Sequence, residues 1–592
     1  MTGAKEGRAS VEVVKAVLVT PSRYDDRGVR IFRLGINQNG SLGAIAGMIV
    51  DYNRRHEGLR SVDFEIYDEH VREAITPARM RSWRDEAAAS GHRFVILLCG
   101  IQTPFYPRAR DLALMARRDG IDVIAGGVHF TAHGPSVDFL TRCGISIGIG
   151  EVEPIWDDIM DDVFRGTRQP IYRLGADRGL RVKTAVNDIT APDLSSAPFP
   201  HMPRRYLPSY LNPHHLYIDG SRGCPFVCTF CSVKNTVGRT MRSRDPQALV
   251  EWMGDRVASG DARWFTFTDD NFVRNPRHLE ILEGLARLRE ERGLKFSLCM
   301  SLDVEAACYA EEDSPQGERN RRFLELCERA GLSNVSMGLE STNDGALKEM
   351  RKNVNRERRA RELDPHTALL QRYRIAVRAF QKIHASVECG YIIGFDADRP
   401  GIGRQAARDM LAIGVDIVNF HLIAALPGAE DYARGAREGR LLITDFNECF
   451  RHRAMLAHPE MSPAELEAEV ATAIRGFYSL PNVLKRVVSG LFGIGRPRVS
   501  GLWIFTKRQL GFKAMLWSGL QSYAEGGVFR RATEVGREAI TDQEALRLYL
   551  GCDQPPGESL LPSALLDEGR MDSLPILSQH TFGENRSTVA AA

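Results

Sequence analysis

Several features that would place this chain in other classes of protein are missing from its sequence. No apolar run reaches the ~18 residues that a membrane-spanning helix needs. The first twenty residues hold no apolar core followed by a cleavage site, so we expect a cytoplasmic rather than a secreted protein. The net charge is only +2, with 78 Lys and Arg against 76 Asp and Glu. Because phosphate backbones are usually bound by a basic surface, this balance argues against a nucleic-acid partner.

Cysteine is scarce and unevenly distributed. The 592 residues contain 11 cysteines, and three of these lie within "CPFVCTFC" at 224–231. The other eight are scattered, mostly in apolar or helical contexts where a buried free thiol is the usual interpretation. Disulfide frameworks are typical of small secreted chains, and a closed structural zinc site normally has four ligands. Three thiols spaced by three and then two residues, with no fourth nearby, therefore predict a metal site with one open position.

The first part of the chain, about 13–165, alternates strand-like and helix-like segments. Five apolar runs are interpreted as buried strands: 13–20, 62–67, 94–99, 122–127 and 145–150. Residues 108–120 form an amphipathic pattern that predicts a helix ending at a glycine. This alternation predicts a doubly wound parallel sheet that binds a ligand at the carboxyl ends of its strands. Gly126 and Gly127 would let a large flat ligand approach the backbone, although ordinary glycine turns explain them equally well.

A second run of alternating strands and helices follows a proline-rich segment at 166–215, which we interpret as a linker. Six strands are expected after it: 216–222, 264–269, 295–301, 334–340, 387–393 and 417–423. They predict a partial (β/α)6 barrel at 216–429, with its chemistry at the carboxyl ends of the strands. The three-cysteine stretch directly follows the first of these strands. The predicted fold class is therefore α/β, a doubly wound sheet followed by a partial barrel.

The remainder, 430–551, is expected to be mainly helical, and 553–592 to be a disordered tail rich in Pro, Ser and Gly. A helix is predicted at 461–480, with Ser462 as its N-cap and Glu465 as the reciprocal partner. Residues 501–520 mix apolar and basic side chains. A membrane-surface helix is one interpretation of them, and a helix in the core or at a substrate cavity is the one we favour.

The pattern Cys224-x-x-x-Cys228-x-Phe230-Cys231 resembles the signature of the radical S-adenosylmethionine (SAM) superfamily. In that family three thiolates bind three irons of a [4Fe–4S] cluster. The fourth iron chelates SAM, which is cleaved on reduction to methionine and a 5′-deoxyadenosyl radical. Thiolates suit iron–sulfur clusters, and an iron without a protein ligand is where a substrate can enter. The resemblance implies Cys224, Cys228 and Cys231 as metal ligands, Phe230 at the cofactor, and an electron donor such as flavodoxin or ferredoxin.

Two later motifs resemble the cobalamin-associated branch of this superfamily. "FTDDNF" at 267–272 ends the second barrel strand, where the family holds the SAM amino group. This implies SAM contacts from three side chains, Asp269, Asp270 and Asn271. "GLESTNDGALKEMRKN" at 338–353 resembles the fourth-strand motif of the branch. It implies that Glu340 and Ser341 contact the ribose or methionine part of SAM.

A third motif, "GYIIGFD" at 390–396, resembles the strand that packs on the adenine of SAM. It implies contacts from Gly390, Ile392 and Gly394. The acidic residue that the family usually places three positions after the last glycine is Ala397 here. Either neighbour, Asp396 or Asp398, could take that role.

The N-terminal segment resembles the cobalamin-binding domain that precedes the barrel in this branch. The resemblance implies cobalamin contacts from six residues: Gln102, Gly126, Gly127, His129, Gly150 and Glu151. Proteins that place a histidine on cobalt carry Asp-x-His-x-x-Gly after the first strand, which is missing here. "DEHVRE" at 68–73 follows the second strand and lacks the glycine, so we interpret it as a helix start. Cobalamin without a histidine–cobalt bond is expected.

Taken as a whole, the resemblance implies an enzyme that uses a [4Fe–4S] cluster, SAM and cobalamin. A C-methyltransferase acting on an unactivated carbon of a small or lipophilic molecule is expected. The alternative is a cyclase or rearrangement enzyme with the same cofactors and no net methyl transfer. A non-catalytic metal-binding or scaffold protein is a third class. Aromatic residues of the C-terminal region, Phe477 and Tyr478 among them, favour a polycyclic lipid or tetrapyrrole over a peptide, although core packing explains them as well.

Overall fold

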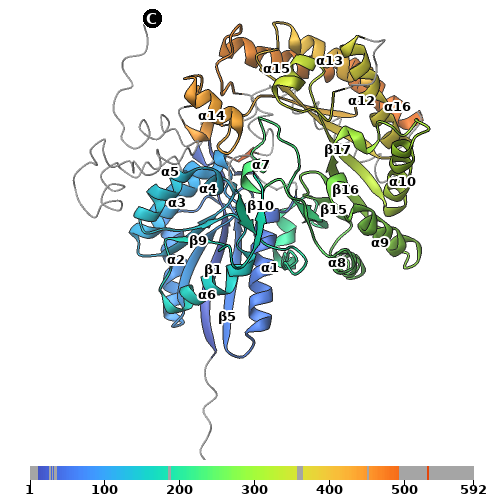
Figure 1. Cartoon of the computed structure of the whole chain (residues 1–592). Helices are drawn as coiled ribbons and strands as arrows, with labels where there is room; N and C mark the ends of the chain where they lie inside the picture. Colours follow the sequence, from blue (N-terminus) through green and yellow to red (C-terminus); the bar gives the residue numbers. More distant parts are fainter. Residues whose placement is uncertain are drawn as a thin grey trace, which may run out of the picture.

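The structure of the chain is a computed structural model in which two six-stranded parallel sheets lie in separate parts of the molecule (Figure 1). It describes residues 11–25, 28–29, 31–32, 37–184, 188–356, 364–443, 445–449, 453–492 and 530–531. The expected tail at 553–592 and the amphipathic segment at 501–520 lie outside these residues. Among the described helices, none is long and apolar enough to cross a membrane.

The N-terminal sheet has the strand order β5-β1-β6-β7-β8-β9. Its strands are β1 (Glu12–Thr20), β5 (Arg60–Asp68), β6 (Arg93–Leu98), β7 (Asp122–Gly126), β8 (Ser146–Ile149) and β9 (Ile171–Arg173). On one face lie α1 (Gly40–Arg55) and α6 (Trp156–Arg165), and on the other α2 (Pro77–Ala89), α3 (Tyr106–Arg118) and α5 (Gly134–Arg142). The prediction of a doubly wound sheet is confirmed. Its topological switch point, where such sheets bind ligands, lies between β1 and β6.

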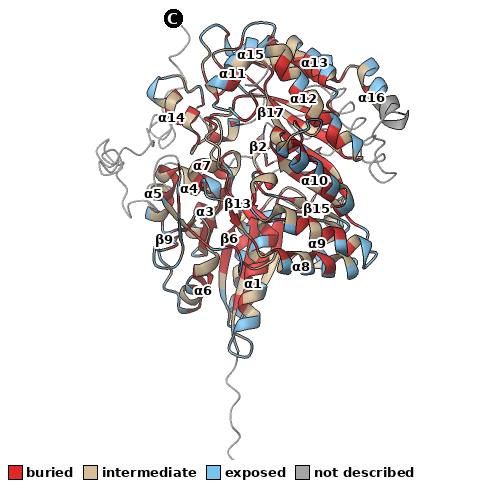
Figure 2. Ribbon diagram, turned by 45° about the vertical axis from the view of Figure 1, so that its right-hand side comes forward, coloured by how far each residue is buried: buried red, intermediate tan, exposed pale blue. Residues whose placement is uncertain are grey.

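The apolar character of β1 follows from this two-sided cover. Val14, Ala16 and Leu18 are buried against α1 and α6, while Val17 and Val19 are buried on the opposite face. A strand that is covered on both faces reads as a continuous apolar run rather than an alternating one. In Figure 2 the interior of the molecule is buried, and the outer surfaces of the covering helices are half-buried or exposed.

The segment expected to be a linker contributes structure of its own. Strand β9 adds a sixth strand to the N-terminal sheet, and β10 (Leu180–Val182) pairs with β11 (Ile189–Ala191) as an antiparallel ribbon. These strands are only three residues long. Such short runs lie below the length at which periodicity distinguishes strand from loop.

The second sheet curves into a half-barrel of strands β12-β15-β16-β17-β18-β19. Its strands are β12 (His215–Ile218), β15 (Trp264–Phe267), β16 (Ser297–Leu302), β17 (Leu332–Glu340), β18 (Ser386–Ile393) and β19 (Ile417–Leu422). The helices between them are α8 (Pro246–Ala258), α9 (His278–Glu290), α10 (Pro315–Ala330), α12 (Pro365–Lys382) and α13 (Ile402–Ile413). In β18, Val387, Cys389 and Tyr391 are fully buried, whereas Glu388 and Gly390 are half-buried. The inner face of the half-barrel is therefore polar and partly accessible.

The first barrel strand is shorter than predicted. The expected strand 216–222 leaves the sheet after Ile218, and β13 (Ser221–Arg222) pairs instead with β14 (Arg242–Ser243). The reason is Asp269, whose carboxylate accepts hydrogen bonds from the Gly220 amide (2.7 Å) and the Ser221 hydroxyl. Hydrogen bonds to the Asp269 side chain thus take the place of the backbone hydrogen bonds that would have continued the strand. The resulting hairpin carries the cysteine loop and helix α7 (Val233–Thr236).

Three helices follow the barrel: α14 (Glu430–Arg437), α15 (Pro463–Phe477) and α16 (Leu480–Phe492). The predicted capping box of α15 is confirmed, since Ser462 and Glu465 each bond the other's backbone amide. Before α15, Asn447 exchanges two 3.0 Å hydrogen bonds with the backbone of Tyr24. This segment therefore joins the half-barrel to the carboxyl edge of the N-terminal sheet.

Candidate active site

The three cysteines of the predicted metal site lie on the loop between β13 and α7. Cys228 is buried, Cys224 and Cys231 are half-buried, and all three are free thiols. The loop begins at Gly223, which has a φ of 104°. A Cβ at this position would lie 2.5 Å from the carbonyl oxygen of Thr240, so the turn requires glycine.

The centre of the loop is fixed by Thr229. Its amide donates to the carbonyl of Met350 (3.1 Å), and its hydroxyl donates to the buried carboxylate of Asp431 (2.9 Å). The amide of Asp431 donates back to the Thr229 carbonyl (3.1 Å). On the other side of Thr229, the half-buried Phe230 packs against the barrel core. The thiols on either side of this pair, at 228 and 231, are therefore held on an ordered backbone.

The chemistry of the three thiols fits an iron–sulfur cluster. Burial raises the pKa of Cys224 to about 11 and that of Cys231 to about 12, and it also raises the pKa of Cys228. Metal binding requires thiolates, so these groups would ionise when iron compensates their charge. In the described part of the chain, no three His, Cys, Asp or Glu side chains converge to hold a single metal ion. Spaced thiolates suit the separate irons of a cluster.

Two of the three side chains predicted to bind SAM at the end of β15 form hydrogen bonds with other groups of the protein. Asp269 is buried and holds the β12–β13 junction, and burial raises its pKa to about 7. Asn271 donates its side-chain amide to Asp303 (2.8 Å), which also binds Arg274. Both side chains therefore order the strand ends. Their predicted contact with SAM stays a prediction.

Asp270 differs from its neighbours because its side chain is exposed and points to the start of the cysteine loop. It accepts a 3.3 Å hydrogen bond from the Gly223 amide. Neighbouring protein groups nevertheless restrict the hydration of this carboxylate, and the loss of hydration raises its pKa to about 6. Of the predicted trio, Asp270 alone offers an accessible carboxylate beside Cys224.

Glu340 ends β17 with a positive φ of 62°, a conformation that costs a non-glycine residue ~1–3 kcal/mol. Its carboxylate accepts a 3.2 Å bond from the ammonium of Lys352, which is largely buried. Burial lowers the pKa of Lys352, but the charges of Glu340 and of the Cys228 thiolate outweigh it, so this pKa lies above its ordinary value. Strained residues of this kind cluster at functional sites. The pair places a carboxylate and an ammonium beside the cysteine loop.

Glycines make room for this ion pair on the inner face of the half-barrel. A Cβ at Gly338 would lie 2.8 Å from the Lys352 ammonium nitrogen, and one at Gly390 would lie 3.3 Å from a Glu340 carboxylate oxygen. Gly390 thus lies next to Glu340. Ile392 is buried, and Ser341 is fully buried with its hydroxyl accepting from the Asn343 amide (3.0 Å). Ser341 therefore shapes the turn after β17.

Gly394, the last glycine of the third motif, has a φ of 108° and begins a turn closed by Asp398. The Asp398 carboxylate accepts from the amides of Gly394 (2.8 Å) and Phe395 (3.2 Å), and burial raises its pKa to about 6. Asp396 pairs with Arg440. Both acids that could replace the missing one at Ala397 are therefore engaged with protein groups.

At the carboxyl edge of the N-terminal sheet, the glycine pair serves packing between loops. Gly127 has a φ of 144°, and a Cβ there would lie 2.1 Å from the amide nitrogen of Ile101. The Ile101 amide donates to the carbonyl of Gly126 (3.0 Å). The loop after β6 thus lies on Gly127, and the approach of a flat ligand to this glycine pair stays a prediction.

His129 is fully buried and stacks on Tyr106 at 4.3 Å between ring centroids. Its Nδ1 lies 3.2 Å from the Thr103 hydroxyl and its Nε2 lies 3.0 Å from that of Ser136. Burial lowers its pKa well below the usual value. Both ring nitrogens of His129 are therefore engaged within the core, and its contact with cobalamin stays a prediction.

The remaining predicted residues lie at the same edge. Gln102 is exposed, and among the described residues its side chain has no hydrogen-bond partner. Gly150 is exposed with a φ of 74°, and its amide donates to Thr131 (3.0 Å). Glu151 does not point to solvent, because Arg222 and Arg242 bind its carboxylate. Gln102 and Gly150 stay available for a ligand, whereas Glu151 is committed to the barrel.

Residues 218–364 match the family model described as the radical SAM superfamily. The chain contains a radical SAM domain. The matched segment includes the cysteine loop, Asp270, Glu340 and Lys352. The prediction of a radical SAM barrel from the spacing of three cysteines is therefore confirmed.

Curated relatives are similar to this chain over part of its length. A bacteriochlorophyllide d C-12(1)-methyltransferase of Chlorobaculum tepidum is 27% identical over 317 residues, 53% of this chain and 59% of the relative. A hopanoid C-2 methylase of Rhodopseudomonas palustris is 26% identical over 232 residues, 39% of this chain and 40% of the relative. The chain thus spans less than two thirds of the length of these relatives.

Solved structures share the fold over most of the chain. The radical SAM methyltransferase TsrM of Kitasatospora setae, solved with cobalamin and a [4Fe–4S] cluster, gives a TM-score of 0.52 at 14% identity. The match covers 84% of this chain and 99% of TsrM. The cobalamin-dependent SAM radical enzyme OxsB gives 0.51 at 14% identity, covering 91% of this chain and 83% of OxsB. At these identities the likeness establishes the arrangement of a doubly wound sheet and a half-barrel.

Sequence reasoning missed several charged residues of the site. Lys352 lies within the quoted fourth-strand motif, twelve residues after Glu340, but Lys348 and Arg351 lie beside it and no local signal distinguished it from them. Arg222 and Arg242 gave no signal, because their acidic partner precedes them by dozens of residues. The predicted helix start at 68–73 is wrong. The chain turns there because Asp68 accepts from both the amide (3.0 Å) and the ring Nδ1 (2.9 Å) of His70.

Proposed function

We propose that the chain is a radical SAM enzyme that binds a [4Fe–4S] cluster, SAM and cobalamin and methylates an unactivated carbon of a small or lipophilic molecule. The observation that carries the proposal is the cysteine loop. Three free thiols lie at the carboxyl end of the first barrel strand, next to the exposed carboxylate of Asp270 and the Glu340–Lys352 pair. Active sites of barrels of this type lie at that end of the strands.

Each of these residues has a defined task in the proposal. Cys224, Cys228 and Cys231 hold the cluster and leave one iron for SAM. Asp270 and Glu340 accept hydrogen bonds from the amino or hydroxyl groups of SAM, and such bonds to a charged group are the stronger kind. Lys352 binds the Glu340 carboxylate and fixes its direction. Bound cluster and cobalamin supply electron transfer to SAM and methyl transfer, so that the protein contributes positioning and the exclusion of water.

Cobalamin is proposed to bind at the carboxyl edge of the N-terminal sheet, where Gln102 and Gly150 are exposed. We retain the expectation that no histidine bonds to cobalt, since His129 is engaged through both nitrogens. A spectrum of bound cobalamin that shows a histidine nitrogen on cobalt would contradict this expectation. In that case His70 is the first histidine to test by substitution. Its Nδ1 is paired with Asp68, and its ring is 24% exposed.

The named relatives support methylation of a polycyclic substrate. One acts on a bacteriochlorophyllide and another on a hopanoid. The aromatic residues Phe477 and Tyr478, which were considered for a substrate cavity, are buried, and Tyr478 bonds the backbone of Val418 in β19. They belong to the core, so the preference for a lipophilic substrate rests on the relatives.

A cyclase without net methyl transfer is the second candidate. An anaerobic magnesium-protoporphyrin IX monomethyl ester cyclase of Rubrivivax gelatinosus is 24% identical over 291 residues, 45% of this chain and 48% of the relative. The same pair of cofactor sites would serve either reaction, so isotope transfer has to distinguish them.

The two reactions differ in the fate of the SAM methyl group. Metabolites of cells with and without the gene are compared first, to find a compound whose mass changes by one methyl group. The purified protein is then given its precursor and SAM with a deuterated methyl group. We expect each product to carry the label, with one S-adenosylhomocysteine and one 5′-deoxyadenosine per turnover. Product formed with 5′-deoxyadenosine but without label or S-adenosylhomocysteine would replace the methyltransferase with the cyclase.

A further inference from the structure

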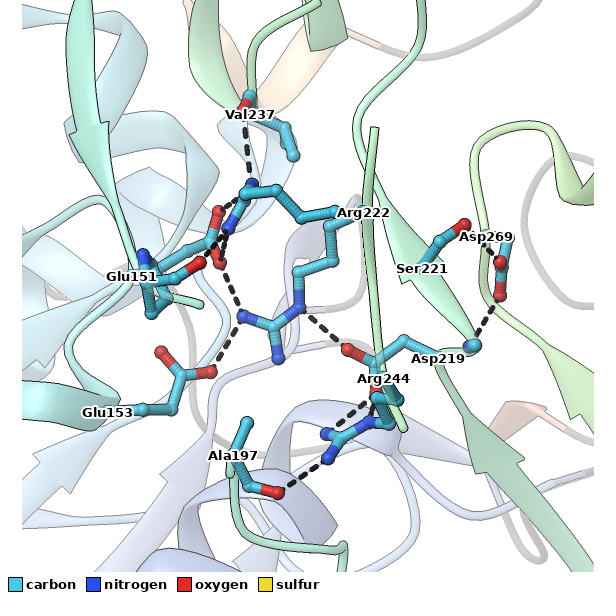
Figure 3. A network of polar contacts seen from close by, with 12 residues as sticks. Glu151, Glu153, Ala197, Asp219, Ser221, Arg222, Val237, Arg244 and Asp269 are labelled. Atoms are coloured by element: carbon cyan, nitrogen blue, oxygen red, sulfur yellow. Dashed lines mark hydrogen bonds and ion pairs between the residues drawn. The ribbon is translucent and has the colours of Figure 1, made fainter. Parts of the chain in front are cut away.

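An ion-pair network joins the end of β8 in the N-terminal sheet to the hairpin that carries the cysteine loop (Figure 3). Arg242 binds both carboxylate oxygens of Glu151. Arg222 binds the same carboxylate at 2.6 Å and that of Glu153 at 2.7 Å. The Arg222 Nε donates to Asp219 (2.7 Å). All of these groups are at most about one-fifth exposed, so water screens their charges weakly.

The network balances its charges within the protein. Its third arginine, Arg244, binds Asp219 (2.9 Å) and the carbonyl of Ala197 (2.6 Å). Three arginines therefore face three carboxylates. The carboxylates gain from this arrangement, since the arginines outweigh the effect of burial and lower the pKa of both Glu151 and Asp219.

The carboxylate of Glu151 lies between two arginines of the hairpin. Arg222 and Arg242 are direct cross-strand partners in the β13–β14 ladder. Like charges opposite each other destabilise a strand pair. The carboxylate of Glu151 lies between the two guanidinium groups and binds both, so it removes this repulsion.

The hairpin leads straight into the metal site. Gly223 follows Arg222, and Cys224 comes next, with its amide donating to the Gly238 carbonyl at the other side of the hairpin (3.1 Å). Arg242 also reaches the carbonyl of Val237. A displacement of either arginine is therefore passed to the backbone that carries Cys224.

We propose that Glu151 is a positioning residue that acts from the N-terminal sheet through Arg222 and Arg242 on the cysteine loop. It holds the first thiolate in place and balances the charges of the two arginines in the hairpin. The contact with cobalamin that the resemblance implied for Glu151 stays a separate prediction. The inference rests on the proposed function in its first test, which measures the cluster. Its second test measures hydrogen exchange and needs no cluster.

The first test uses the sign of the network's charge. Glu151→Gln leaves the network with one excess positive charge, and Arg242→Gln leaves it with one excess negative charge. Because reduction adds an electron to the cluster, its reduction potential is expected to rise in Glu151→Gln and to fall in Arg242→Gln. The double variant restores neutrality and is expected to lie near the parent. Mere disorder of the loop would move both single variants in the same direction and would overturn the proposal.

The second test needs no cluster. Hydrogen exchange of the full chain as purified is expected to be faster at the amides of 223–232 in Glu151→Gln, with unchanged exchange in α9. Asp261→Asn is the matched control. It removes two arginine bonds, from Arg204 and Arg256, at the opposite end of the half-barrel, and is expected to leave the loop unchanged. Equal exchange in the loop of the parent, Glu151→Gln and the control would overturn the proposal.

A third variant covers the case in which Glu151→Gln does not fold. Glu153→Gln removes one bond to Arg222 and one negative charge, and is expected to shift potential and exchange in the same direction by less. No shift in either quantity would contradict the proposal. A parent that takes up no iron would instead contradict the proposed function, and exchange would still test Glu151.

Discussion

Replacing Cys224, Cys228 and Cys231 together with alanine is expected to abolish iron–sulfur absorption after anaerobic reconstitution and to stop formation of 5′-deoxyadenosine from SAM. The physical reason is that the thiolates are the only cluster ligands in the account. The fold is expected to survive, because none of the three cysteines belongs to the main core cluster and a chain of this size buries a large core without them. Iron and sulfide content, visible absorption and SAM cleavage measure the effect.

The control for this variant removes an equal number of thiols elsewhere. Cys143, Cys308 and Cys449 are buried in the core cluster and do not belong to the loop, so their replacement by alanine is expected to leave iron content and SAM cleavage unchanged. The assignment of the loop would be wrong if the loop variant still produced 5′-deoxyadenosine, or if the control lost its cluster to the same extent.

The second large effect is expected on SAM affinity. Asp270→Asn and Glu340→Gln keep the size of each side chain and remove its charge. Each loses a charge-assisted hydrogen bond of about 1.5–3 kcal/mol, which corresponds to a ten- to hundredfold weaker Kd. Titration of the reconstituted protein with SAM measures this loss, and iron content checks that the cluster is still assembled.

Asp344→Asn is the matched control for these two variants. Asp344 lies in the same motif as Glu340, at the start of helix α11 (Asp344–Glu349). Its carboxylate pairs with Arg356. Its replacement is expected to leave SAM affinity unchanged. If Asp270→Asn and Glu340→Gln both bind SAM as the parent does, these carboxylates only order the protein.

The parts of the fold that local pattern governs could be predicted from the sequence. The continuous apolar run of β1 and the capping box of Ser462 and Glu465 each depend on residues within a few positions of one another. The cysteine loop was recognisable for the same reason, since its spacing is contained in eight residues. Such local signals survive folding because few distant partners compete with them.

Features that depend on distant partners could not be predicted. The strand expected at 216–222 breaks because Asp269 captures its backbone. Gly127 needs its conformation because Ile101 packs on it, and Glu151 is bound by arginines of another sheet. In each case the sequence contains both partners but no local pattern that pairs them.

The most direct test of the central claim is electron paramagnetic resonance of the reduced, reconstituted protein with and without SAM. An open iron at the three-cysteine loop predicts a [4Fe–4S]⁺ signal whose g-values change when SAM is added, and the change should weaken in Glu340→Gln. A signal that SAM leaves unaltered, or zinc bound by the loop in place of iron, would contradict the account.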